Sequence, residues 1–135
     1  MDEKIIKKSY IEVLELVQDL ILCHPMYNNK GQLNAQKVLC KYLNSKGWTT
    51  YIDRYSFQDL KKDEVVKRPW EYDEYYKDYK EIEKYNLYAV LDSGNPGKTL
   101  ILNGHIDVDI INKTDSLANT NPHLLSDRIQ GRGAA

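Results

Sequence analysis

The chain has 135 residues, of which 41% are hydrophobic and 29% are charged. This length and composition fit one globular domain at most. The 19 basic and 20 acidic residues leave a net charge of −1, which gives no reason to expect a nucleic acid or an anionic membrane as a partner.

The first residues, "MDEKIIKKSY", are charged throughout and contain no apolar signal core. The longest apolar stretch, "LVQDLILC", is too short to span a bilayer. Two cysteines, Cys23 and Cys40, are too few for a disulfide framework, and we interpret both as small apolar core residues rather than metal ligands. With no export signal, these features predict reduced thiols in a cytoplasmic protein.

Apolar residues at spacings of three and four predict an amphipathic helix over residues 3–22, which ends before Pro25. The same periodicity predicts a second helix over residues 32–46, with Gly47 as its stop signal. The β-branched and aromatic residues of "WTTYIDRY" then predict a strand.

Residues 58–84 are dense in both charges and tyrosines. Tyrosines from Tyr72 onwards and Ile82 lie at helical spacing, which predicts a solvated helix with one aromatic stripe. The stripe either packs on the domain, which is the commoner arrangement, or binds a partner protein. Acids match the basic residues, so the segment gives no argument for nucleic-acid binding.

Two further apolar segments, "YNLYAVLD" and "TLILNG", are joined by "SGNPGK", and this pattern predicts a β-hairpin. The run "TLIL" shows no alternation, so we expect a strand that is covered on both faces. Residues 112–128 are predicted to form an exposed loop.

His105 and Asp107 follow directly after "TLILNG". In α/β proteins, functional groups collect beyond the carboxyl ends of buried strands, and residues two apart in extended backbone point the same way. Imidazole is the commonest protein metal ligand, and a neighbouring carboxylate often fixes its orientation. The pair therefore predicts one shared site, although a lone histidine near a strand end is more often structural, and Asp109 is most simply a solvated loop carboxylate.

The stretch "LILNGHIDVD", followed by "DRIQGRGAA", resembles the zinc-dependent acetylornithine deacetylase, succinyl-diaminopimelate desuccinylase and aminoacylase family of metallopeptidases. In that family an apolar strand leads into Gly-His-x-Asp-Val, and a later Gly-Arg-Gly-Ala/Ser precedes a metal-bridging aspartate. The stretch "LNAQKVLCKYLNSKGWTTYIDRY" is similar to the family's helix, glycine and strand. The resemblance leaves out the Tyr-rich residues 58–84, which look like an insertion.

This resemblance implies an α/β fold: the N-terminal part of a three-layer catalytic domain, with a twisted mixed sheet flanked by helices. It implies that His105 is a ligand of one of two metal ions, zinc or cobalt, and that Asp107 is the catalytic carboxylate that supports this histidine. Two departures stand out. Asp109 replaces the frequent proline after Val108, and the chain ends at Ala135, where the family's bridging aspartate would be the next residue.

The implied function is the N-terminal portion of a metal-dependent amidohydrolase that cleaves an amide bond of an N-acyl amino acid or small peptide. In the complete enzyme, the metal ions polarise the amide carbonyl and generate hydroxide, and a glutamate moves the proton. A catalytic zinc site needs about three protein ligands, and we interpret His24 and His123 as non-ligands. We therefore expect this chain to hold no metal stably and to be inactive alone.

A catalytic sheet that is cut short exposes apolar surface. We therefore expect exposed apolar residues here, covered in the complete protein by a C-terminal portion or by self-association. The alternative function is a non-catalytic, degenerate fragment or a module that binds a partner protein through its Tyr-rich face.

Overall fold

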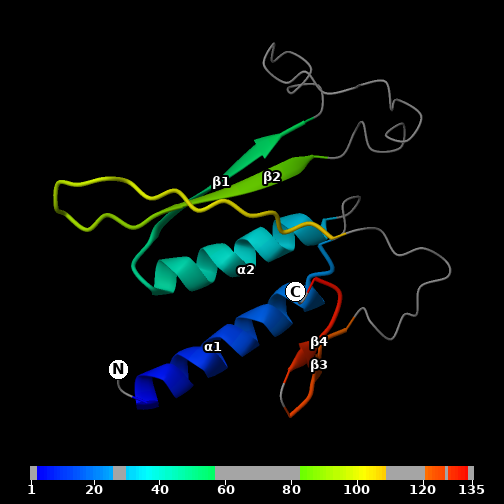
Figure 1. Cartoon of the computed structure of the whole chain (residues 1–135). Helices are drawn as coiled ribbons and strands as arrows, with labels where there is room; N and C mark the ends of the chain where they lie inside the picture. Colours follow the sequence, from blue (N-terminus) through cyan, green and yellow to red (C-terminus); the bar gives the residue numbers. More distant parts are fainter. Residues whose placement is uncertain (1–2, 26–29, 57–82, 109–120, 127, 134–135) are drawn as a thin grey trace.

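The computed structural model describes residues 3–25, 30–56, 83–108, 121–126 and 128–133. The described part has a mixed α/β structure, with two helices and two small antiparallel sheets (Figure 1). In chain order the elements are α1 (Glu3–Leu22), α2 (Gly31–Ser45), β1 (Thr49–Tyr55), β2 (Lys84–Val90), β3 (His123–Leu124) and β4 (Ile129–Gln130). Neither described helix is long and apolar enough to cross a membrane.

Both predicted helices are confirmed to within one residue at each end. Gly47 explains why α2 ends where it does, because its φ of 84° lies in the left-handed region that glycine tolerates. The backbone N–H of Trp48 donates to the Leu43 carbonyl at 3.1 Å, and the N–H of Gly47 donates to Asn44 at 3.0 Å. These two bonds are the Schellman pattern that satisfies the last carbonyls of a helix.

The larger sheet consists of β1 and β2, which pair antiparallel from Thr49 opposite Val90 to Tyr55 opposite Lys84. Helix α2 packs against both strands, and α1 lies against α2 (Figure 1). Along the middle of β2 the side chains alternate between half-buried and exposed, which is typical of a sheet covered on one face. Within these packed helices and strands, the side chain of Ala35 of α2 is fully buried.

The uncovered side of this sheet carries aromatic residues. The rings of Tyr51 and Tyr88 stack there with their centroids 6.1 Å apart. Cross-strand aromatic pairs of this kind stabilise a two-stranded pairing by about 0.2–1 kcal/mol.

The predicted hairpin between residues 85–92 and 99–104 is wrong. Strand β2 pairs with β1, and residues 99–107 form no strand. The prediction that "TLIL" is buried is also wrong, since Leu100, Ile101 and Leu102 are 81%, 82% and 83% exposed. After β2 the chain makes a long excursion away from the helices and then returns (Figure 1). An apolar segment is buried on both faces only where other elements cover it, and no described helix or strand covers residues 99–103.

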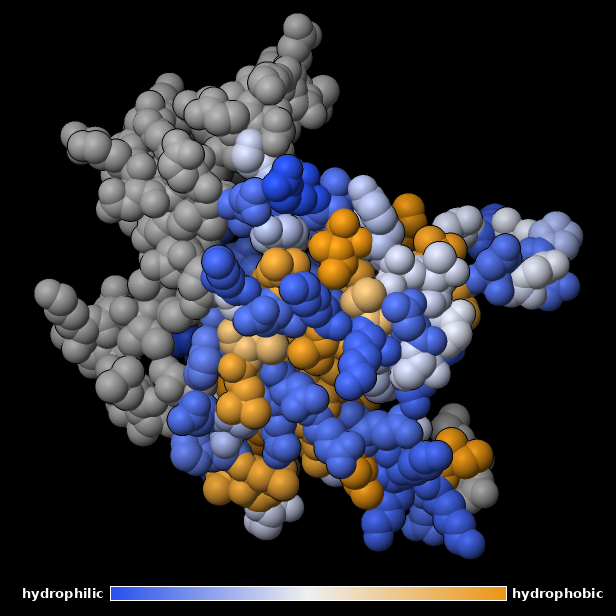
Figure 2. All heavy atoms as spheres, turned by 180° about the vertical axis from the view of Figure 1, so that it is seen from behind, coloured by the Kyte–Doolittle hydropathy of each residue, from blue (hydrophilic) through white to orange (hydrophobic). Residues whose placement is uncertain are grey.

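The exposed apolar surface that the sequence predicts is present among the described residues. Helix α1 exposes much of its length, including Ile5 and Val13, and contributes Ile21 to the small core. In Figure 2, apolar side chains lie scattered among hydrophilic ones over the face opposite to the view of Figure 1. The apolar stripe of α1 is therefore wider than the part that α2 covers.

Two predicted features lie largely outside the described residues. The Tyr-rich helix was predicted within residues 58–84, of which 58–82 lie outside the described residues, and Lys84, the last residue of that segment, is the first residue of β2. Asp109 and residues 112–120 are also outside. The remaining end of the predicted loop is exposed but contains β3, which pairs with β4 in a two-residue ladder.

Candidate functional site

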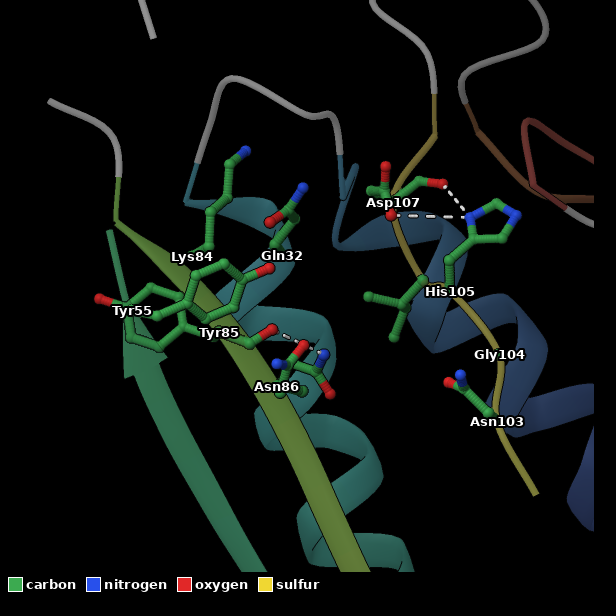
Figure 3. A pocket seen from close by; sticks show the side chains of 11 residues that line it. Gln32, Tyr55, Lys84, Tyr85, Asn86, Asn103, Gly104, His105 and Asp107 are labelled. Atoms are coloured by element: carbon green, nitrogen blue, oxygen red, sulfur yellow. Dashed lines mark hydrogen bonds and ion pairs between the residues drawn. The ribbon is translucent and has the colours of Figure 1, made fainter. Parts of the chain in front are cut away.

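His105 and Asp107 lie together on the return of the excursion (Figure 3). Nδ1 of His105 is 3.0 Å from the backbone carbonyl oxygen of Asp107 and 3.6 Å from its carboxylate oxygen Oδ1. A carbonyl oxygen can only accept, so this hydrogen bond places the proton on Nδ1 and leaves the lone pair on Nε2. The histidine side chain is 85% exposed, and Nε2 is therefore accessible to a ligand.

The oriented imidazole is what the resemblance implies, but the orienting group differs. The backbone carbonyl of Asp107 holds the ring, while its carboxylate lies beyond hydrogen-bonding distance. Both arrangements fix the tautomer and direct the free nitrogen outward.

The two sequence motifs that carry the resemblance meet in space. A Cβ atom built on Gly133 would lie only 2.7 Å from Cγ1 of Val108, so the "GRG" turn packs against the residue after Asp107. The φ of Gly133 is 80°, which also favours glycine at this position. The backbone N–H of Val108 donates to the carbonyl of Pro25 at 3.0 Å, which ties this segment to the end of α1.

Gly131, the first glycine of "GRG", makes a second close approach. A Cβ atom there would lie 2.9 Å from Cδ1 of Ile21. The two glycines therefore let one turn pack on α1 and on the His-x-Asp segment together, although the motifs are far apart in sequence.

A groove of about 560 Å³ opens beside His105 (Figure 3). One side is formed by α2 and the sheet, and the other by the returning chain. Its lining residues are Gln32, Gln36, Tyr55, Lys84, Tyr85, Asn86, Asn103, Gly104, His105, Ile106 and Asp107. Gln36 donates from Nε2 to the Tyr85 carbonyl at 3.3 Å, which fixes α2 against β2 along this wall.

Lys84 is the most unusual group in the groove because it is only 5% exposed. Burial lowers the pKa of its ammonium group to about 8, and the negative charge of Asp107 partly opposes this shift. The same burial raises the pKa of the Tyr55 hydroxyl, to which the charge of Asp107 adds. The carboxylate of Asp107 thus acts electrostatically on both groups across the groove.

The described residues do not by themselves assemble a metal centre. No group of three or more histidine, cysteine, aspartate or glutamate side chains within the described ranges is placed to hold an ion. His24 follows the end of α1, and His123 begins β3. His105 therefore remains the one ligand position that the resemblance implies.

Both cysteines are free, and both are half-buried, whereas the sequence predicted buried core residues. The Sγ atom of Cys40 and the Oγ1 atom of Thr50 are 2.9 Å apart, which links α2 to β1. Burial raises the pKa of the Cys23 thiol, and the charge of Asp19 raises it further. A raised thiol pKa reduces the thiolate that metal binding requires.

Sequence reasoning missed the half of the groove that α2 and the sheet supply. By strand alternation Lys84 lies on the same side of β2 as Asn86 and Tyr88, which are both exposed. The pattern therefore predicts a solvated lysine. Its burial depends on segments that are distant in sequence, which no local pattern reveals.

Comparison with known proteins adds no relative. No family model, curated protein or solved structure matches this chain.

Proposed function

We propose that the chain is the N-terminal portion of a metal-dependent amidohydrolase or peptidase that cleaves an amide bond of an N-acyl amino acid or small peptide. In this proposal it belongs to a three-layer catalytic domain with a mixed sheet flanked by helices. His105 binds one metal ion through Nε2, and Asp107 orients the imidazole. The cofactor is zinc or cobalt, and two ions are bound in the complete enzyme.

The observation that carries the proposal is the contact between Val108 and Gly133. It joins "GHIDV" and "GRG", the two motifs on which the resemblance depends. If the two segments matched the family by chance, we would not expect them to pack against each other. The contact is close, because Gly133 leaves no room for a side chain. The position of His105 after a buried strand does not support the proposal, because residues 99–103 are exposed and form no strand.

The described residues supply one metal ligand, so we expect the 135-residue chain to show no turnover alone. The measurement is incubation of the purified chain with zinc or cobalt and a panel of N-acyl amino acids and dipeptides. Turnover that His105→Ala abolishes would contradict the expected inactivity but support the role of His105. Turnover that survives in His105→Ala would contradict both.

A second candidate is a non-catalytic, degenerate fragment of such an enzyme or a module that binds a partner protein. The exposed stretch from Leu100 to Leu102 favours it, because contiguous apolar surface is typical of binding sites. The codons that follow the one for Ala135 separate the two candidates. The enzyme requires an aspartate directly after Ala135 and a Glu-Glu pair further on in the same frame, whereas a stop codon favours the module.

A further inference from the structure

We propose that the groove beside His105 binds a neutral ligand that contains an amide group, with Tyr55 donating a hydrogen bond to the ligand's carbonyl oxygen and Asn103 bonding to its amide. The two side chains come from separate parts of the fold, since Tyr55 ends β1 and Asn103 lies on the returning chain. Both line the groove. In Figure 3 the side chain of Asn103 extends from the returning chain toward the wall formed by α2 and the sheet.

The first argument concerns the hydroxyl group of Tyr55, which forms no hydrogen bond with another described residue. By contrast, the hydroxyl of Tyr85 on the same wall donates to Glu83 at 2.6 Å. Every fully buried side-chain oxygen or nitrogen in the described part of the chain has a partner, so the unpaired hydroxyl of the half-buried Tyr55 is accessible to a ligand. Burial and the charge of Asp107 raise its pKa, so the hydroxyl keeps its proton and donates at neutral pH.

The second argument is that carboxamide side chains occur on both walls of the groove. Asn86 lies on the same face of the sheet as Tyr55, because Tyr55 pairs with Lys84 and residues two apart in a strand share a face. Asn103 is on the returning chain opposite. Neither asparagine side chain bonds to another described residue. A carboxamide carries two donors and an acceptor, so it can pair with both the C=O and the N–H of a ligand amide.

The third argument is that the lining favours a neutral ligand over an ionic one. Lys84 and Asp107 carry opposite charges and attract each other, and Lys84 already has an interaction partner. The side chains that remain for a ligand are therefore hydroxyl and carboxamide groups. An ion in the groove would lose hydration that such neutral groups replace only in part, whereas an amide exchanges its hydrogen bonds with water for equivalent ones.

The groove also has room for a ligand beside the returning chain. A Cβ atom built on Gly104 would meet nothing within 4 Å, so open space borders the backbone between Asn103 and His105. An amide held by Asn103 and Tyr55 thus lies beside the segment that carries the histidine. The identification of this amide as part of a hydrolase substrate rests on the proposed function. The binding site itself does not, and it is tested without metal or turnover.

The test is an NMR titration of the metal-free chain, labelled at tyrosine and asparagine side chains. The probe is N-acetylglycine N-methylamide, a neutral molecule with two amide groups. Its matched control is methyl acetoxyacetate, in which an ester oxygen replaces each amide N–H. We expect saturable shifts at Tyr55 and Asn103 with the diamide. Binding of the diester should be about tenfold weaker, because it has no N–H to donate and its carbonyl oxygens are weaker acceptors.

Tyr55→Phe removes only the hydroxyl group and should weaken binding of the diamide about two- to tenfold, the effect of one neutral hydrogen bond. The control is Tyr88→Phe, which removes the hydroxyl of a tyrosine on the same face of the sheet but outside the groove, and it should leave binding unchanged.

The proposal is overturned if the diamide gives no saturable shifts at Tyr55 and Asn103, or if the unmodified chain binds the diester as tightly as the diamide. Both of these measurements are independent of any variant. It is also overturned if folded Tyr55→Phe binds the diamide as tightly as the unmodified chain. None of these results bears on whether His105 binds a metal ion, so failure of the binding site and failure of the proposed function are distinguishable.

Discussion

Strand β2 and residues 99–103 are both apolar segments with the composition of a strand, yet they lie in opposite surroundings. Strand β2 pairs along its whole length with β1 and is covered by α2. Residues 99–103 follow the excursion, form no strand, and expose three large aliphatic side chains in succession. The difference shows that an apolar sequence favours burial but does not ensure it. A segment is buried only where other helices or strands pack against it.

The largest expected effect is on self-association, and it comes from a charged substitution within the exposed residues 99–103. The segment around Ile101 is an exposed apolar stretch that pairs with none of the described strands, so we expect the purified chain to self-associate through it. Burying one isoleucine contributes about 1.5–3 kcal/mol, so Ile101→Lys should weaken association about tenfold or more. Sedimentation velocity at several protein concentrations measures this.

The matched control for that experiment is Ile5→Lys, which places the same charge on an exposed isoleucine of α1. It should leave the association of the chain largely unchanged. A chain that stays monomeric at every concentration and unfolds cooperatively would show that residues 99–103 need no partner.

A smaller effect is expected on the free energy of unfolding when a larger side chain is introduced where α2 packs on the sheet. Ala35 is fully buried between α2 and its neighbours, so Ala35→Leu should lower the free energy of unfolding by about 1–3 kcal/mol. Urea denaturation followed by circular dichroism gives the value. Lys37→Leu introduces the same side chain at an exposed position of α2 and should be close to neutral. Equal effects of the two substitutions would mean that α2 is not packed as described.

A further effect is the dependence of stability on pH. Because burial lowers the pKa of Lys84 from 10.5 to about 8, the folded chain binds fewer protons than the unfolded chain between these values. Its free energy of unfolding should therefore rise with pH across this window. Below pH 8 the cost of the buried charge is fully present, so Lys84→Met should be more stable relative to the unmodified chain at pH 7 than at pH 10.

Urea denaturation of both proteins across this window checks the pH dependence, with Lys98→Met as the control for loss of a lysine charge. The difference between Lys84→Met and the unmodified chain should shrink as the pH rises. A difference that is constant with pH would contradict the burial of the Lys84 ammonium.

Local features of the fold could be predicted from the sequence. The 3.6-residue periodicity identified both helices, and Gly47 identified the end of α2, because these features depend on neighbours within a few residues. The positions of β1 and β2 were also predictable, but their pairing was not. The turn "SGNPGK" favoured a hairpin with residues 99–104, whereas β2 pairs with a strand that precedes it by a long segment.

The candidate site likewise contains residues that could be predicted from local sequence and residues that could not. His105 and Asp107 are two residues apart, so their shared position followed from local backbone geometry. Lys84 and Gln32 come from distant segments, and nothing in the spacing of either residue indicates that they line one groove. The packing of Gly133 on Val108 was likewise hidden, because it depends on the path of the chain between them.

The most direct test of the role of His105 is a cobalt titration of the chain, observed by NMR of the three histidine side chains. Paramagnetic cobalt broadens the signals of nuclei near which it binds, so even weak binding is visible. Nδ1 of His105 is held by the Asp107 carbonyl, and Nε2 is accessible. We predict that His105 broadens first, that His24 and His123 follow only at higher cobalt concentration, and that His105→Ala removes the early phase. Broadening that begins at His24 or His123, or that affects all three histidines equally, would contradict the assignment of His105 as the metal ligand.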